Sequence, residues 1–319
     1  MRLQDSPAGP SNHQSLTAIT NPQWRPMLIR IVSILFPLFA ITALGFMVGR
    51  WMKPDLSHAN KLNMDVFVPA LVFSALANKS FEVAQYVPLG IATLVLVVGS
   101  GLAAWAASKP LGQNPRTLVP PMMFNNCGNL GLPLAVLAFG DAALAPAVVM
   151  FMVSNLLHFS FGAWLLDHHI RIVNLWRIPS VLATFAGIAV SLAGFEVWPP
   201  LMVAIKMLGD IAIPLMLLGL GVRLTDSRIS EIRLGLIGAS ARPLIGMLLA
   251  VLVMQVIDLS QQEQALLLVF GALPPAVLNY IFAERYNQEP EKVASMVLIG
   301  NIASLVFLSA ALAVALPEA

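Results

Sequence analysis

The feature of this chain that most limits its fold is a series of ten apolar runs, separated by charged or Pro- and Gly-rich breaks. A helix of about 20 apolar residues crosses the hydrocarbon core of a bilayer, and each run has about that length. Charged residues make up only 11% of the chain, against about 25% in a soluble domain, too few to cover a water-facing surface. We therefore predict an all-α integral membrane protein with ten transmembrane helices. The predicted spans are residues 30–51, 59–78, 87–108, 116–140, 145–167, 178–198, 199–224, 236–258, 261–284 and 292–316.

The basic residues predict how these helices are oriented, because Lys and Arg concentrate in cytoplasmic connections. The connections after odd-numbered spans contain twelve of them, whereas those after even-numbered spans contain only Lys79. Three arginines of the N-terminal tail, Arg2, Arg25 and Arg30, oppose this distribution without outweighing it. We predict a multi-pass protein of a cell inner membrane or plasma membrane, with both termini extracytoplasmic. The polar residues 1–29 are expected to form a disordered extracytoplasmic tail.

Three motifs occur twice at nearly the same offset, which indicates a duplicated unit. Because five spans, an odd number, separate the copies, the second copy is expected to be inserted upside down, as in secondary transporters. We predict a first five-helix repeat at 30–167, a cytoplasmic linker at 168–177 and a second, inverted repeat at 178–319. The matched pairs are 61–69 with 206–214, 132–137 with 273–278 and Asn155 with Asn301, at offsets of 145, 141 and 146 residues.

Residues 119–133 in span four are unusually rich in small, amide and proline residues. Glycine loosens a helix and proline cannot donate a backbone hydrogen bond, so we predict two half-helices joined by an unwound stretch. Pro274 and Pro275 are expected to break span nine in the same way. Unwound backbone at membrane depth is tolerated where it lines a polar cavity or is buried in protein. The residues predicted to form a substrate-binding cavity are Asn125, Asn126, Gly128, Asn129, Pro133, Pro274, Pro275 and Asn279.

The two broken helices together predict a site for an anion. Pro133 and Pro274 are each suited to be the first residue of a second half-helix, whose free amides and positive dipole end point at the membrane centre. A carboxylate fits there, with Asn126 and Asn129 as side-chain donors. The alternative is that the prolines only kink the helices and that the asparagines hold neighbouring helices together. Cys127, the only cysteine, is interpreted as a small filler residue.

Two acids lie inside predicted spans, each one helical turn after a lysine: Asp65 follows Lys61, and Asp210 follows Lys206. An acid at the centre of a membrane helix costs about 2.5–3.5 kcal/mol on insertion scales. These pairs are therefore candidates for proton coupling or gating. The alternative is a static salt bridge whose lysines reach the membrane interfaces.

Four other polar residues lie within the spans. Asn155 and Asn301 occupy matching positions in the two repeats and are candidates for coupling or gating. Arg242 is a candidate counter-charge for the substrate or partner for Asp210, and is interpreted foremost as an arginine that reaches the cytoplasmic surface. His158, one turn after Asn155, is interpreted as a packed histidine rather than a proton relay.

Two segments resemble the auxin efflux carrier family of permeases: Asn126-Cys-Gly-Asn-Leu-Gly-Leu-Pro133 and the stretch from Ala272 to Asn287. Bacterial members of that family include malonate- and malate-type carriers, and the plant auxin carriers are distant relatives; the bile acid–sodium symporters look like a related fold. The resemblance implies ten spans with crossing broken helices in spans four and nine, a scaffold and a transporter unit, and organic-anion substrates.

The resemblance also assigns individual positions. It places Asn126 at the anion site of the plant relatives and aligns Pro133 and Pro274 with the crossover prolines. Asn279 stands where the plant carriers have proline. The long central loop of the plant carriers is absent, because only a short connection separates Asp167 from the next span.

The leading interpretation is a secondary transporter, not an enzyme, that moves a small organic anion by alternating access, driven by protons or by the membrane potential. Sodium-coupled symport is the first alternative, and an intramembrane aspartyl protease using Asp65 and Asp210 is a remote one. No phosphate-binding loop is present, and the basic residues follow membrane topology rather than a nucleic-acid surface. We expect no cofactor or metal beyond a coupling H+ or Na+. The expected partners are the anion and the lipid bilayer, with a homodimer left open.

Overall fold

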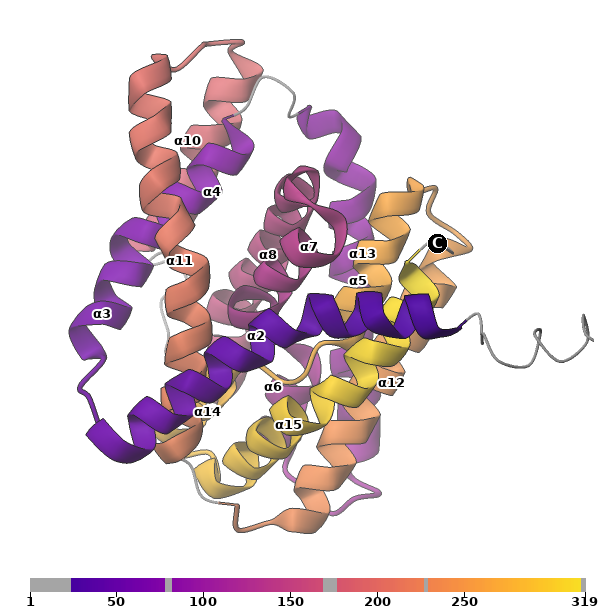
Figure 1. The fold of residues 1–319 in the computed structure, drawn as a ribbon. Coiled ribbons are helices and arrows are strands. Elements are labelled where there is room, and N and C mark those ends of the chain that lie inside the picture. The colour runs from indigo at the N-terminus through magenta and orange to yellow at the C-terminus, as the bar shows by residue number, and fades with distance from the viewer. Residues whose placement is uncertain (1–23, 78–81, 169–176, 227–228, 317–319) are drawn as a thin grey trace, which may run out of the picture.

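The computed structural model describes residues 24–77, 82–168, 177–226 and 229–316, which are mainly helical (Figure 1). The first helix, α2 (Trp24–Met52), begins at Trp24 rather than at residue 30. Pro26 lies in its first turn, where a missing N–H removes no intrahelical hydrogen bond. The rest of the expected tail, and residues 169–176 of the expected linker, lie outside the described residues.

The remaining helices follow the predicted runs closely. In the first half they are α3 (Ser57–Leu62), the π-helical turn η1 (Asn63–Phe67), α4 (Val68–Leu76), α5 (Val83–Ser108), α6 (Pro115–Met123), the π-helical turn η2 (Cys127–Gly131), α7 (Leu132–Phe139), the short η3 (Asp141–Ala143), α8 (Leu144–Leu157), the π-helical turn η4 (His158–Gly162) and α9 (Ala163–Leu166). In the second half they are α10 (Pro179–Leu192), α11 (Pro199–Asp226), α12 (Ile232–Met254), α13 (Gln261–Ala272), α14 (Val277–Arg285) and α15 (Pro290–Ala315).

Six helical segments of the described chain are long and apolar enough to cross a membrane. The other predicted spans are shorter or interrupted, so the count of ten and the inverted repeat stay predictions. The six segments are Arg25–Met52, Val83–Ser108, Asp141–Leu166, Pro199–Thr225, Ile232–Met254 and Pro290–Ala315.

The helices form two groups that meet along the middle of the molecule (Figure 1). In the first group, called here the α11 group, α11 packs against α2 and α4, and α10 packs against α4. In the second, called here the crossing group, α5, α6, α8, α12, α13, α14 and α15 pack against one another. Helices α2 and α11 approach very closely, since a Cβ on Gly221 would collide with the Thr42 carbonyl oxygen. Small residues commonly allow such contacts between membrane helices.

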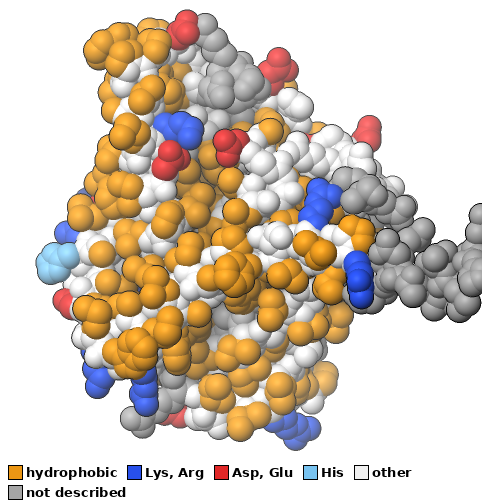
Figure 2. Space-filling view, viewed as in Figure 1, with side chains coloured by type: hydrophobic (Ala, Val, Ile, Leu, Met, Phe, Trp, Pro, Cys, Tyr) orange, Lys and Arg blue, Asp and Glu red, His pale blue; other side chains and the backbone are white. Residues whose placement is uncertain are grey.

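The outer surface is largely apolar. Figure 2 shows a face covered mainly by hydrophobic side chains, with Lys, Arg, Asp and Glu mostly near its margins. Large side chains such as Phe36, Trp105 and Val306 are 69%, 64% and 69% exposed. Water-soluble proteins rarely expose so much apolar surface, whereas helices that face lipid do.

Two helices are interrupted where the sequence predicts breaks. The chain is unwound between α6 and η2 and again between α13 and α14, and Asn125 and Pro275 form an antiparallel bridge between the two unwound stretches. The interruption of both helices is therefore confirmed. The predicted role of the prolines is wrong. The second half-helices begin at Cys127 and Val277, whereas Pro133 lies in the first turn of α7 and Pro274 lies inside the break.

Candidate functional site

The two breaks are joined by backbone hydrogen bonds of the kind that join strands. Asn126 N–H donates to the Pro274 carbonyl at 2.8 Å, and Ala276 N–H donates to the Phe124 carbonyl at 3.0 Å. Backbone that leaves a helix at membrane depth must find partners inside the protein. Each break supplies partners for the other, which explains why the two unwound stretches cross in contact.

Two asparagines reinforce this crossing in a reciprocal manner. Asn125 of the first break donates from Nδ2 to the Phe270 carbonyl of α13 at 2.7 Å. Asn279 of α14 donates from Nδ2 to the Phe124 carbonyl at 2.9 Å. Both side chains are buried, at 2% and 1% exposure. Each is therefore a second donor to a carbonyl at an interrupted helix end, because Leu273 N–H also donates to Phe270 and Ala276 N–H to Phe124.

A third link joins the first break to α15. Asn126 Nδ2 donates to Asn301 Oδ1 at 3.0 Å, and Asn301 Nδ2 donates to the carbonyls of Pro275 at 3.1 Å and Val297 at 2.8 Å. The sequence offered two readings of these asparagines, ligand donors or helix-to-helix contacts. The side-chain amides of Asn125, Asn126, Asn279 and Asn301 all make helix-to-helix contacts here.

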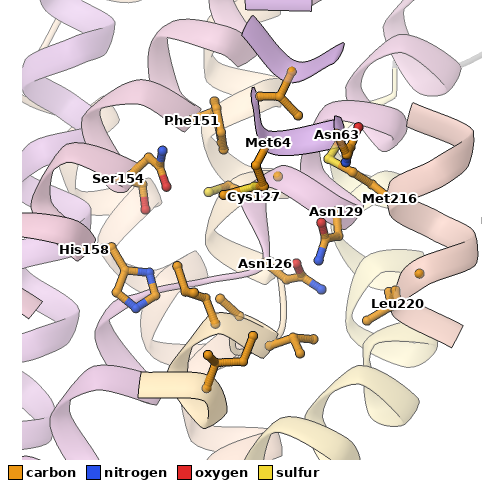
Figure 3. A pocket seen from close by; sticks show the side chains of 18 of the residues that line it. Asn63, Met64, Asn126, Cys127, Asn129, Phe151, Ser154, His158, Met216 and Leu220 are labelled. Atoms are coloured by element: carbon orange, nitrogen blue, oxygen red, sulfur yellow. The ribbon is translucent and has the colours of Figure 1, made fainter. Parts of the chain in front are cut away.

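A cavity of about 280 Å³ lies beside the crossing, between the α11 group and the crossing group. Figure 3 shows His158 and Ser154 on one side of it, with Asn63, Asn129 and Met216 across from them. The residues that line it from the α11 group are Asn60, Asn63, Met64, Val68, Ser180, Met216, Gly219, Leu220 and Arg223. Those that line it from the crossing group are Asn125, Asn126, Cys127, Gly128, Asn129, Phe151, Ser154, Asn155, His158, Phe159, Ala276, Val277, Leu278 and Ile281.

The predicted binding residues divide into two sets. Those of the first break line the cavity: Asn125, Asn126, Gly128 and Asn129. The others are buried or half-buried in the crossing and do not line the described cavity: Pro133, Pro274, Pro275 and Asn279. The cavity is therefore asymmetric with respect to the two breaks, because the polar lining residues that a break contributes come from the first one.

The start of the second half-helix, η2 followed by α7, lies in the cavity wall at Cys127 and Gly128. Its first intrahelical hydrogen bonds run from the N–H groups of Leu130 and Gly131 to the Asn126 carbonyl. The amides before Leu130 have no partner within the helix, as at any helix start. They lie at the positive end of the helix dipole, which favours an anion.

The cavity is electropositive. Arg223 lines it, and no Asp or Glu lies among the described residues around it. No ion pair of Arg223 occurs within the described part of the chain. Three buried polar atoms of lining residues also have no hydrogen-bond partner there: Asn63 Oδ1, Asn125 Oδ1 and His158 Nε2. Buried polar atoms in proteins are normally paired, so this wall has unused capacity for a ligand.

The predicted Lys–Asp pairs lie elsewhere. Lys206 Nζ lies 3.4 Å from Asp210 Oδ2, but these side chains are 62% and 59% exposed. Lys61 and Asp65 are also exposed, and no ion pair joins them in the described chain. The π-helical turn η1 contains Asp65 and widens the helix there, which removes the i,i+4 alignment that the sequence suggested. None of these four residues lines the cavity.

Arg242 is fully buried, at 0% exposure, so its interpretation as an arginine that reaches the surface is wrong. Its Nη1 donates to the Gly271 carbonyl near the C-terminal end of α13 at 2.6 Å, while Nε and Nη2 have no described partner. Helices α12 and α13 cross closely at Gly246 and Gly271, which encloses the side chain. A cation at this position stabilises the negative end of the half-helix.

A family model described as "Membrane transport protein" matches residues 30–169 and 168–312, which together cover most of the chain. The chain belongs to this membrane transport family. This confirms the resemblance to the auxin efflux carriers. The chain is 26% identical over 306 residues to a "putative malonate transporter" of Rhizobium meliloti strain 1021, covering 87% of this chain and 93% of the relative. It is 21% identical over 276 residues to an "uncharacterized transporter" of Methanocaldococcus jannaschii, covering 79% and 88%.

For this member of the membrane transport family, sequence reasoning missed several polar residues of the cavity wall. Arg223 was counted among the loop arginines, although α11 continues to Asp226 and carries Arg223 one turn after Gly219. Asn60 and Asn63 lie three residues apart within a predicted span, a spacing that places both on one helix face and was a usable signal. His158 was correctly interpreted as packed, but its position in the cavity wall was not foreseen.

Proposed function

We propose that this protein is a secondary transporter that carries a small organic anion across the membrane by alternating access. The cavity beside the crossing carries the proposal, because Arg223 and the start of a half-helix line it and no described carboxylate does. A guanidinium and free helix amides both favour a carboxylate. Ligand pockets usually have volumes of about 300–1,000 Å³, so a cavity of about 280 Å³ suits a small ligand.

The position of the cavity supports alternating access. Arg223 belongs to the α11 group, while Cys127 and Gly128 belong to the crossing group. An anion held by both sides stabilises the state in which the groups are closed around it, and a ligand shifts an equilibrium by its differential affinity for the two states. Rocking of one group against the other then exposes the anion to one membrane face at a time.

The topology is part of the proposal. We infer ten spans, two of them broken, arranged as inverted repeats with both termini extracytoplasmic. The reciprocal contacts of Asn125 and Asn279 support this arrangement, because each break donates an amide to a carbonyl of the other broken helix. The relative named as a malonate transporter makes dicarboxylates the first substrates to examine. An inner membrane or plasma membrane is the proposed location.

The test is uptake of radiolabelled mono- and dicarboxylates into proteoliposomes that contain the full-length protein. Truncating one partner of a close charge pair costs about 2–5 kcal/mol, so Arg223→Gln should raise KM at least about 30-fold. The matched control is Arg233→Gln on α12, whose arginine is exposed and lies outside the cavity. Equal transport by the two variants would overturn the assignment of Arg223. Absence of saturable counterflow with every carboxylate would overturn the transport proposal.

Sodium-coupled symport is the second candidate. Asn63 and Asn125 both line the cavity. Their buried Oδ1 atoms have no described hydrogen-bond partner, and amide oxygens are suitable ligands for a hard cation. Replacement of sodium by an organic cation distinguishes the two mechanisms. Uptake that stops without sodium supports symport with Na+, whereas uptake that persists without sodium and collapses with a protonophore supports proton coupling.

A further inference from the structure

We propose that His158 is the proton-binding residue that couples anion movement to H+, an inference that rests on the proposed transport function. In this scheme the empty cavity holds a neutral imidazole. The carboxylate of the anion and one proton then bind together, the proton on a ring nitrogen of His158. Both are released on the opposite side of the membrane, so that one proton accompanies each anion.

His158 lies in the part of the cavity wall that the crossing group forms. It begins η4 directly after α8, is only 4% exposed and lines the cavity. Figure 3 shows one ring nitrogen directed toward the cavity. Its Nε2 has no hydrogen-bond partner in the described chain. A buried imidazole with an unpaired nitrogen at a ligand cavity has an unused site for a proton or a hydrogen bond.

The rings around His158 suit a histidine that is charged for only part of the cycle. Phe124 of the first break stacks on the imidazole, with ring centroids 4.1 Å apart and an angle of 7° between the planes. Phe282 of α14 meets it edge-on at 5.2 Å and 64°. Aromatic faces stabilise a nearby cation modestly, but they do not replace water around a full charge. His158 therefore needs an anion before it holds a proton.

The charged groups near the cavity also indicate that His158 holds a proton only when an anion is bound. Arg223 and Cys127 are the other ionisable lining residues, and Arg242 on α12 interacts electrostatically with Cys127. On α14, Glu284 and Arg285 are exposed and so do not face the ring. A cation in a cavity wall opposes protonation of a histidine in the same wall, whereas a bound carboxylate favours it. Linkage then makes the effect reciprocal, so the proton must strengthen anion binding by the same factor.

A neighbouring asparagine gives the protonated ring a second partner. Asn279 lies beside the His158 side chain, and its Oδ1 accepts no hydrogen bond of regular geometry within the described chain. A protonated imidazole has two N–H donors. One can donate to the carboxylate in the cavity and the other to Asn279 Oδ1. Because Asn279 Nδ2 holds the Phe124 carbonyl, the charge state of His158 is connected to the crossing of the two breaks.

The test measures transport in proteoliposomes between pH about 6.5 and 8, where ordinary carboxylic acids are ionised. The probe is the best-transported carboxylate of the screen above. One coupled proton predicts that KM falls up to about tenfold for each unit of decreasing pH, and that an acidic outside drives accumulation. His158→Gln should transport more slowly, with a KM that no longer follows pH and no accumulation driven by the gradient. His168→Gln is the matched control, because His168 is exposed and lies outside the cavity.

A pH-indicator dye inside the vesicles adds a measurement on the unmodified protein, in case His158→Gln does not fold. One proton entering per anion supports the proposal. A wild-type protein that transports without pH dependence, or a His158→Gln variant that keeps the wild-type pH dependence, overturns the role of His158 and leaves the transport function standing. A wild-type protein that transports no carboxylate overturns both.

Discussion

Gly300 on α15 packs directly against the second break, with no space for a larger side chain. A Cβ added there would lie 2.7 Å from Cδ of Pro275 and 3.4 Å from its Cγ. The proline ring is rigid, and its carbonyl is held by Asn301, so it cannot move aside without loosening the break. Overpacking of this kind costs about 1–3 kcal/mol. Alanine regains up to about 1 kcal/mol of helix propensity, so Gly300→Ala should destabilise the protein by about 1–2 kcal/mol.

Gly131→Ala is the matched control, because its added Cβ would lie 2.9 Å from Cδ1 of Leu273, the tip of a flexible side chain. That side chain can rotate, and the gain in helix propensity offsets the remaining cost. The assay is thermal unfolding in detergent, followed by a thiol-reactive fluorophore, since Cys127 is the only cysteine and is 8% exposed. At about 2–4 °C per kcal/mol, Gly300→Ala should lower Tm by about 2–8 °C relative to Gly131→Ala. Equal melting temperatures would refute the argument that Pro275 is rigidly held.

Three other outcomes are expected. Asn126→Ala should abolish transport with normal membrane insertion, and its stability loss should be non-additive with that of Asn301→Ala, because the two side chains share one hydrogen bond; additive losses in a double-mutant cycle would contradict this. A transported carboxylate at saturation should protect Cys127 from a small maleimide, measured by labelling rate, and unchanged labelling would place the anion elsewhere. Hydrogen bonds from Lys292 and Thr117 lower the pKa of Glu289 below its usual 4.5, so its stabilisation is complete above that pH and is lost as pH falls through the lowered value; Glu289→Gln should show a smaller loss of Tm on acidification.

Both interruptions of the fold were predictable from composition. A cluster of prolines, glycines and amide side chains within an apolar run indicates that the helix is interrupted there. The location of each stop was not predictable to the residue. Pro133 is accommodated in the first turn of α7, because a π-helical turn precedes it. Pro274 and Pro275 lie within the break, where their carbonyls accept hydrogen bonds from Asn126 and Asn301.

The cavity was less predictable, because its residues come together only through helix packing. Arg223 and His158 are far apart in the chain, and nothing in their local sequence places them in one wall. The paired motifs around Asp65 and Asp210 led to the opposite error. They predicted two equivalent ion pairs inside the membrane, but matching sequences lie in different environments here. A π-helical turn removes the ion pair at Asp65, while the equivalent lysine and aspartate of α11 remain paired and exposed.

The crossing shows why amides and not charged groups hold the breaks together. Interrupted helices leave carbonyls such as Phe124 and Phe270 in the interior, where each accepts one backbone N–H and can accept a second donor. A lysine there would introduce a charge at a cost of several kcal/mol, whereas Asn125 and Asn279 supply neutral donors. Arg242, which does supply a charge, donates to the Gly271 carbonyl and lines no part of the cavity. With the crossing held by amides, Arg223 is the arginine of the cavity wall, so an entering carboxylate meets a cation that the described structure has not already paired.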